Sequence, residues 1–520
     1  MAVIQTQTDG PEPSFDEHPH LAVASYRIIA LATVQSVSRS FSASDEAYET
    51  FPRLHSHSAR TRSAFRLTLL PFVHNAQRPP RVRVKPGNNR FPEPRLSWTG
   101  TRVPETTIVA HTPGWTALDK LYVFNGTIFV VTSTPEEIPE PKLLTSSGYE
   151  IFNGPVERAK RKPSEKDIRI ITPEEARVIF GTQSAIRLDG VSFMNTDPKQ
   201  FIKHYYHWAA ELFFGFWRAY SSLDIFITAD GQTNLPPPRR MIFRHVSTTE
   251  WRDYASMNQW VTRGAFPSLS MEFKEDWADR AAMQVPFVFD RVLLADRASA
   301  GEGEPFLITW RSASNAFVLP GSQQWWSPIR RSVLEFSGAG TQWIYGPNPD
   351  GTAEYEKFVI TYISRQKWGR RMLRQADHEK LVQELYKLRD RYGYEVNVVN
   401  MDKLTRAEQI QLAGRTTIMM GVHGNGLTSL LWMRPTRRAT VIEFFYPGGV
   451  AFDYEFTTRA LGMKHYGVWN NETFTRPNIS PFPIYPEGFQ GNDIPLNGTV
   501  VAQLVQDRLT LKPEPSTDTS

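Results

Sequence analysis

The chain has 520 residues, of which 40% are hydrophobic and 22% are charged, a composition typical of a globular protein with two or three domains. This composition excludes a mostly disordered, collagen-like or coiled-coil chain. The net charge of +5 is too small by itself to indicate nucleic-acid binding. The absence of Cys excludes disulfides, thiolate nucleophiles and Cys-ligated zinc.

The first 100 residues are predicted to form a poorly structured tail or a degraded membrane anchor, because they are rich in Pro, Ser and Arg and show little periodicity. The most apolar stretch, 21–38, contains Arg27 and Gln35 and follows an acidic segment, whereas a signal anchor prefers basic residues before its apolar run. We therefore expect membrane association only if this stretch acts as an anchor.

The segment 101–340 is predicted to be a mixed α/β domain. A hairpin is expected at Asn125-Gly126, because this dipeptide favours tight turns and β-forming residues flank it. The other expected elements, in chain order, are an exposed loop at 135–166, an aromatic helix at about 200–220, a strand at 226–229, a Pro-rich turn at 234–240, a strand at 241–246, a helix at 277–284 and a strand at 285–296.

From about 355 strands and helices alternate regularly, which predicts a Rossmann-like domain over 341–510 with ligands at the carboxyl ends of its parallel strands. The two domains are expected to join near 335–355. The expected strands are 358–365, 394–402, 416–422 and 440–447, and the expected helices are 378–393, 404–415 and 424–433.

The segment GVHGNGLTSL, at 421–430, is a glycine-rich turn between an expected strand and an expected helix. The N–H groups at a helix N-terminus can hold a diphosphate, and His423 could add a hydrogen bond. A turn that only packs a strand against a helix uses Gly just as readily, so both interpretations stay open. The candidate anion-binding residues of this turn are His423, Gly424, Asn425, Gly426, Leu427 and Thr428.

Four residues near the end of the expected strand 358–365 form a second candidate anion site. Ser364 and Arg365 lie where the strand ends, and Arg370 and Arg371 follow. A guanidinium group can make two parallel hydrogen bonds to a phosphate. The alternative is a solvated basic loop.

The helix at about 200–220 is apolar nearly all round, so it is expected to be buried. His204, His207 and Glu211 share one face of this helix. A buried carboxylate must be paired, or it is a base with a raised pKa. A catalytic Glu211, a salt-bridged Glu211 in the core and an inert cleft-facing histidine therefore all remain open.

On these residues the chain resembles the family 61 glycosyltransferases, which include plant xylan xylosyl- and arabinosyltransferases and animal O-linked GlcNAc transferases, and it looks like a fungal-type member. The resemblance covers about 200–450 and departs from the family at Asn425, where Ala is usual. The segments that carry it are His207-Trp208-x-x-Glu211, YISR with Arg370-Arg371, and 407–433 followed by TVIEFF.

This resemblance implies a GT-B fold, in which two Rossmann-like domains face each other across a cleft. It also implies an inverting transfer of a sugar from a nucleotide-sugar donor, with UDP-linked xylose or GlcNAc expected, to a hydroxyl of a glycan or glycoprotein. The segment 341–510 would bind the donor and 101–340 would form the acceptor side. A secretory location, in the Golgi or the ER lumen, is implied as well.

The resemblance also assigns roles to single residues. Glu211 is the expected catalytic base, with His207 as the alternative. Glu443, at a strand end, is expected to bind the ribose. The residues expected to bind the donor diphosphate are Ser364, Arg365, Arg371 and the turn 423–428.

The sequence contains no Asp-x-Asp motif, so the usual carboxylate clamp for a divalent metal on the donor diphosphate is missing. Arginines and helix N-termini would have to balance the diphosphate charge, and neither a metal nor another cofactor is expected. The alternative function is a non-catalytic module that binds a nucleotide or a carbohydrate. Nucleic acid is not an expected partner.

Overall fold

The structure, a computed structural model, describes residues 94–345 and 357–511. Residues 1–93 of the predicted tail, with its apolar stretch 21–38, lie outside the described residues, as do residues 346–355 of the predicted junction. None of the helices within the described ranges combines the length and the apolar character that a membrane span requires.

The first β-sheet has nine strands in the order β5-β4-β3-β9-β6-β7-β8, with β1 beside β6 and β2 beside β3. The hairpin predicted at Asn125-Gly126 is confirmed, since both residues have positive φ between the antiparallel strands β3 and β4. These strands are β1 (Arg95–Ser97), β2 (Thr107–Thr112), β3 (Trp115–Phe124), β4 (Thr127–Val131), β5 (Ile168–Ile171), β6 (Ser184–Asn195), β7 (Arg240–Phe243), β8 (Ser270–Glu272) and β9 (Phe287–Ala295).

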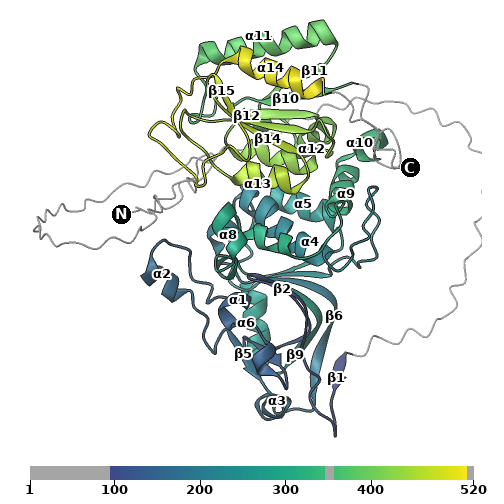
Figure 1. Ribbon diagram of the computed structural model, residues 1–520. Coiled ribbons are helices and arrows are strands. Elements are labelled where there is room, and N and C mark those ends of the chain that lie inside the picture. The colour runs from purple at the N-terminus through teal and green to yellow at the C-terminus, as the bar shows by residue number, and fades with distance from the viewer. Residues whose placement is uncertain (1–93, 346–356, 512–520) are drawn as a thin grey trace, which may run out of the picture. The chain divides into compact units, whose positions relative to one another are not determined.

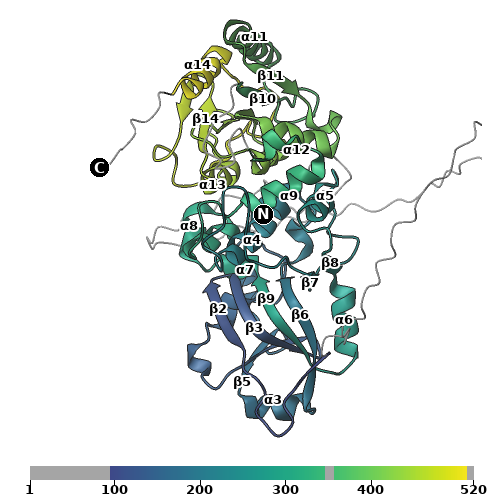
Figure 2. The ribbon, with the colours of Figure 1, turned by 90° about the vertical axis from the view of Figure 1, so that its right-hand side faces the viewer.

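This first sheet is mixed and so differs from the doubly wound parallel sheet of a Rossmann-like domain. Strand β3 pairs antiparallel with β2, β4 and β9, whereas β6 pairs parallel with β7 and β9. The hairpin explains the antiparallel pairing of β3 with β4, because a two-residue turn can only join antiparallel neighbours. Figure 2 shows β2, β3, β9 and β6 side by side.

Several short helices accompany the first sheet. The strand predicted at 226–229 is wrong: these residues form turns, and Phe226 is 78% exposed. The predicted loop 135–166 contains three short helices. The helical segments are η1 (Pro135–Glu137), α1 (Pro141–Leu144), α2 (Pro155–Lys160), α3 (Pro173–Phe180), η2 (Lys199–Phe201), η3 (His207–Phe213), α4 (Phe214–Ser221), α5 (Met257–Ala265), α6 (Lys274–Ala282), α7 (Arg297–Ala300), α8 (Glu304–Thr309), η4 (Ser312–Val318), α9 (Ser327–Ser337) and α10 (Thr341–Tyr345).

The second sheet has six strands in the order β11-β10-β12-β13-β14-β15, all parallel except β15. The alternation predicted from 355 onward is therefore confirmed. Its elements are β10 (Val359–Ile363), α11 (Gln375–Tyr392), β11 (Glu395–Val399), η5 (Met401–Lys403), α12 (Arg406–Arg415), β12 (Ile418–Val422), η6 (Asn425–Trp432), β13 (Thr440–Phe444), α13 (Asp453–Ala460), β14 (Lys464–Trp469), β15 (Glu472–Phe474) and α14 (Gly498–Leu509).

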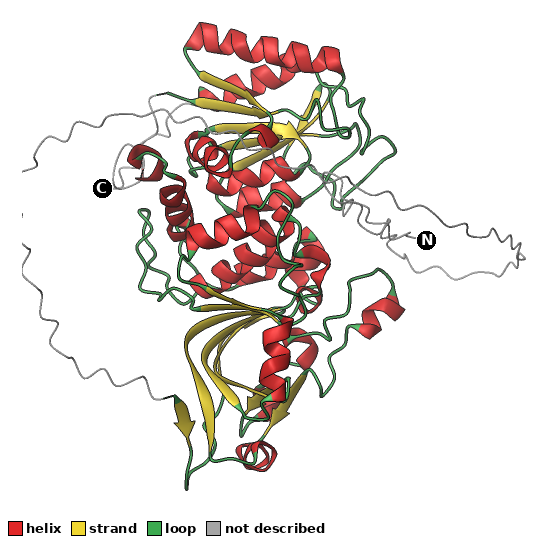
Figure 3. Cartoon of the chain, turned by 180° about the vertical axis from the view of Figure 1, so that it is seen from behind, coloured by secondary structure: helices red, strands yellow, loops and turns green. Residues whose placement is uncertain are grey.

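The two faces of the second sheet have different neighbours. Helices α11 and α14 cover one face (Figure 1), and Leu381 and Val505 of these helices belong to one buried cluster with Ile442 of β13. The other face joins a buried cluster that also contains Phe193 of the first sheet and Trp326, which directly precedes α9. A layer of helices therefore lies between the two sheets and shares one apolar core with both (Figure 3).

Within this layer, Arg330 connects α9 by hydrogen bonds to the end of η6, which belongs to the half of the chain that forms the second sheet. Its buried guanidinium donates to the carbonyl oxygens of Trp432 at 3.0 Å and Ile344 at 3.0 Å. Hydrogen bonds from a charged donor are worth about 1.5–3 kcal/mol each. This arginine therefore has a structural role at the junction of the two sheets.

Replacing Arg330 by Met should lower the free energy of unfolding by at least about 3 kcal/mol, because several buried carbonyls would lose their donor. The matched control is Arg331→Met on the same helix. Arg331 pairs with Glu335 at the surface, where an ion pair contributes less than about 1 kcal/mol. Urea unfolding of both variants tests this; equal losses would contradict the structural role of Arg330.

Candidate functional site

The strand order of the second sheet places a crevice at one particular edge. The chain passes from β10 to β11 on one side and then returns to β12 on the other side of β10. Ligands of open parallel sheets bind outside the carboxyl ends of the strands where the order reverses in this way. The first residues beyond the three strands are Ser364, Asn400 and His423.

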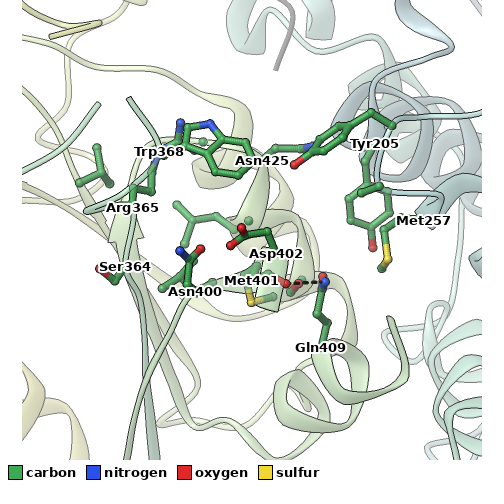
Figure 4. Close-up of a pocket in the computed structure, with 18 residues that line it drawn as sticks. Tyr205, Met257, Ser364, Arg365, Trp368, Asn400, Met401, Asp402, Gln409 and Asn425 are labelled. Carbon is green, nitrogen blue, oxygen red and sulfur yellow. Dashed lines mark hydrogen bonds between the residues drawn. The ribbon is translucent and has the colours of Figure 1, made fainter. Parts of the chain in front are cut away.

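A cleft of about 680 Å³, which includes the open solvent at its mouth, lies at these strand ends. We call it the large cleft. Figure 4 shows Tyr205 and Met257 on the opposite side of this cleft from Ser364 and Arg365. Residues from both halves of the chain therefore build one site. Other lining residues are Tyr254, Trp368, Asn400, Met401, Asp402, Gln409, Gly424, Asn425, Gly426 and Leu427.

The turn after β12 and the arginine after β10 fit closely against each other. The buried guanidinium of Arg365 lies against Gly424, and any Cβ atom at this position would clash with a guanidinium nitrogen. The indole of Trp368 lies 5.7 Å from the same guanidinium group. The glycine in this turn therefore makes room for a cationic side chain at the cleft, which a turn used only for packing would not require.

Hydrogen bonds to Asn425 connect the turn after β12 to the layer of helices between the two sheets. Its side-chain oxygen accepts hydrogen bonds from the backbone N–H of Tyr206 and from the Thr428 hydroxyl, each at 3.2 Å. Thr428 itself is buried and is not among the residues that line the large cleft. Its contribution is to hold the turn, and Asn425 contributes a contact that Ala could not make.

A second, smaller cleft of about 300 Å³ lies on the other side of the turn. We call it the small cleft. It shares Gly424 and Asn425 with the large cleft, so the two clefts are neighbours. The other lining residues are His204, Tyr206, His207, Arg370, Arg371, His423, Asp453 and Tyr454.

The electrostatic character of the small cleft is basic. Two arginines and three histidines line it, against one carboxylate, Asp453. That carboxylate is already paired with the buried Arg311, at 2.7 Å. The small cleft therefore favours an anionic group.

The structure separates the arginines that the sequence predicts to act together. Arg365 lines the large cleft, whereas Arg370 and Arg371 line the small one. Arg371 is buried, donates from Nε to the Gln490 side chain at 2.7 Å and contacts the carbonyl of His423 at 3.4 Å. Cations thus lie on both sides of the turn that separates the clefts.

His207 and Glu211 form a tight pair within the π-helical segment η3. The His207 Nδ1 lies 2.5 Å from a Glu211 oxygen, and Arg297 donates to the same oxygen at 2.7 Å. Burial by itself would raise the pKa of Glu211, but the charge of Arg297 and the hydrogen bond from His207 outweigh it and hold this pKa well below its usual range. Glu211 is 1% exposed and lines neither cleft, whereas His207 lines the small one.

Glu443 is also fully buried. One of its oxygens lies 2.5 Å from His423 Nδ1, and the other lies 2.8 Å from His465 Nε2. Burial raises its pKa, but the hydrogen bonds from both histidines outweigh this and lower it. Both oxygens have partners and the side chain lines neither of these two clefts, and the contact of Glu443 with a ribose stays a prediction.

Sequence reasoning missed several residues of the clefts. Asn400 and Asp402 directly follow β11, so the rule that ligands bind at strand ends could have found them. Tyr205, Tyr254 and Met257 carry no such signal, because they reach the large cleft from the other half of the chain.

Among the residues that the structure describes, no group of three or more His, Cys, Asp and Glu side chains is arranged to hold a metal ion. The expectation that no metal takes part therefore stays a prediction, which solution measurements must test.

Cationic clefts at the reversal point of a parallel sheet are typical of α/β proteins that bind phosphorylated ligands. The model of one such family, described as Glycosyltransferase 61, matches residues 205–442. This range begins at a residue of the large cleft and includes both arginine segments and the glycine-rich turn. The match supports a glycosyltransferase of family 61, as the motifs indicated. No curated protein matches the chain.

If the cleft binds UDP, as the resemblance implies, Gly424→Ala should displace the Arg365 guanidinium and so weaken UDP binding by about 1.5–3 kcal/mol, the value of a charge-assisted hydrogen bond. Arg365→Ala should have a similar effect, with little change in the melting temperature of the protein without ligand. Because both variants remove the same contact, the double variant should lose less than the sum. Calorimetry of the four proteins tests this; strictly additive losses would show that Gly424 and Arg365 act independently.

Proposed function

We propose that the protein is an inverting glycosyltransferase that moves a sugar from a UDP-linked donor, xylose or GlcNAc, to a hydroxyl group of a glycan or glycoprotein. One observation carries this proposal: a histidine paired with a buried carboxylate lines a basic cleft that shares its wall with a larger one. A base and an anion site next to each other are what such a transfer needs.

In this proposal the large cleft holds the donor. The nucleoside lies along 400–402, and its diphosphate reaches the turn at 424–426. Arg365 on one side and Arg371 on the other balance the charge that develops on the diphosphate as it leaves. Because guanidinium groups carry a permanent charge, they can do this at any physiological pH.

We assign the catalytic base to His207 rather than to Glu211. Glu211 is a weak base here, because Arg297 and His207 stabilise its ionised form. With Nδ1 held by Glu211, Nε2 of His207 accepts the proton of the acceptor hydroxyl. The acceptor oxygen then bonds to the anomeric carbon of the sugar, the bond from this carbon to the diphosphate breaks, and UDP leaves. Glu211 is a positioning residue that fixes the tautomer of His207.

The proposal has three further parts, of which the secretory location rests on the family match. The two halves of the chain correspond to the two domains of a GT-B enzyme. The protein acts in the secretory pathway, in the Golgi or the ER lumen. It is a fungal-type member of the family.

A donor screen tests the proposal. The purified protein is incubated with UDP-xylose, UDP-GlcNAc and GDP-sugars, and the release of the nucleotide is measured with and without mixed glycan acceptors. UDP release that depends on an acceptor is the expected result. Binding of UDP without any release from any donor would instead favour a non-catalytic binding module.

His207→Gln should lower single-turnover transfer about 100-fold or more, because it removes the base, while the melting temperature and UDP affinity stay near wild type. Glu211→Gln should also lower transfer and, in addition, destabilise the fold by about 3–5 kcal/mol, because Arg297 would lose its buried partner. Full transfer by His207→Gln would eliminate His207 as the base.

Treatment with EDTA followed by gel filtration should leave the rate of transfer unchanged, because arginines and the turn at 424–426 stabilise the leaving diphosphate. The control is the same protein assayed with added Mg²⁺ or Mn²⁺, which should not raise the rate. A large loss of rate that Mn²⁺ restores would show that the arginines alone do not suffice.

A further inference from the structure

Among the described residues that line the large cleft, Asp402 has the only carboxylate. Every other polar side chain that lines this cleft can donate a hydrogen bond, whereas an ionised carboxylate can only accept one. The part of a ligand that meets Asp402 must therefore carry hydrogen-bond donors, unlike a phosphate group.

The carboxylate of Asp402 is accessible to a ligand. Its side chain is 33% exposed, and Figure 4 shows it toward the interior of the cleft. Its ion pair, at 3.4 Å, is with the neighbouring Lys403, whose side chain is 74% exposed. An ion pair this exposed is weak, so a ligand can compete with it.

Gln409 of α12 holds the segment that bears Asp402. Its Nε2 donates to the carbonyl oxygen of Met401 at 2.8 Å and to that of Leu404 at 3.2 Å (Figure 4 shows the first of these bonds). These two carbonyls lie on either side of Asp402 in the chain, so one amide group fixes the short helical segment η5 at the cleft. Gln409 belongs to the segment 407–433 that carries the family resemblance, and the proposed function gives it no task.

The strand order indicates which part of the donor meets Asp402. In the proposed function the transferred sugar must reach His207, which lines the small cleft beyond the turn at 424–426. Strands β11 and β12 lie on opposite sides of β10, so the segment after β11 is about two strand spacings, or roughly 10 Å, from the turn after β12. Asp402 therefore lies on the side of the nucleoside and away from the transferred sugar.

Of the groups in a nucleoside diphosphate, the ribose fits this carboxylate best. The diphosphate is itself negative and would be repelled. The uracil edge alternates acceptors with a single N–H donor, which suits an amide such as that of Asn400 better than a carboxylate. The 2′- and 3′-hydroxyls offer two neighbouring donors to two carboxylate oxygens.

We propose that Asp402 accepts hydrogen bonds from the 2′- and 3′-hydroxyls of the donor ribose, and that Gln409 is the residue that positions Asp402 for this contact. The inference rests on the proposed donor site and makes that site selective for ribonucleotides. The sequence-based candidate for the same contact, Glu443, is buried and does not line the large cleft.

The first test compares UDP with 2′,3′-dideoxy-UDP by calorimetry in the presence of EDTA, so that a metal bridge cannot contribute. The wild-type protein should bind UDP about 10-fold or more tightly than the dideoxy nucleotide, because hydrogen bonds to a charged group are strong. Asp402→Ala should bind the two nucleotides equally well. It should bind inorganic diphosphate at least as well as wild type, because it loses only a negative charge.

Substitutions in α12 test the role of Gln409. Gln409→Leu removes the N–H donor and should lower the preference for UDP over the dideoxy nucleotide, while the affinity for inorganic diphosphate stays near wild type. Gln409→Glu keeps the shape but not the donor and should act in the same way. The matched control is Glu408→Gln, at the exposed start of the same helix, which should keep the full preference. A wild-type preference in both Gln409 variants would overturn the positioning role.

Three other outcomes would contradict the inference in different ways. An Asp402→Ala variant that keeps the full preference for UDP would overturn the ribose contact and leave the proposed donor site standing. A wild-type protein that binds both nucleotides equally well, with both bound more weakly by Asp402→Ala, would assign the carboxylate to the base instead. A wild-type protein that binds neither nucleotide would overturn the proposed donor site and, with it, this inference.

Discussion

Buried charges that must be balanced locally organise the region between the two sheets. Glu211, Asp453 and Glu443 all lie in the interior, and each has a cationic or protonatable partner within 2.8 Å. An isolated buried charge is costly, whereas a paired and hydrogen-bonded one can be tolerated. These pairs hold in place histidines and arginines that lie at or near the clefts. The chemistry of the site therefore depends on how the buried charges are balanced.

The same interactions connect the two halves of the chain. Arg311 follows the first sheet, yet its ion pair is with Asp453 in α13, and the Tyr206 hydroxyl donates to the carbonyl of that same aspartate at 2.8 Å. Asn425 accepts a hydrogen bond from the backbone of Tyr206. The helix that carries His207 is thus held directly against the turn that separates the clefts, which keeps the proposed base and the proposed anion site in a defined relation.

Hydrophobic periodicity and turn residues were sufficient for much of the fold. Four strands of the second sheet, β10 to β13, could be predicted because each is a short run of β-forming residues followed by a helical segment, whereas β14 and β15 were not predicted. Gly393 ends α11 with positive φ. The strand predicted at 226–229 was wrong, because the β-forming residues of this segment have no neighbouring strand to pair with. The long strand β6 was missed, since its first half alternates with charged and small residues and gives only a weak signal.

The sequence by itself determined the residue types at the candidate site and the strand ends that bear them: Arg365 after β10 and the turn at 423–428 after β12. This information is local, because a strand, its final residue and the following turn are neighbours in the chain. Only the tertiary structure decided that Arg297 neutralises Glu211, that His465 shares Glu443 with His423, and that Tyr205 faces Arg365 across the large cleft. These contacts join residues distant in sequence, and the protonation and role of a buried group depend on such partners rather than on its own residue type.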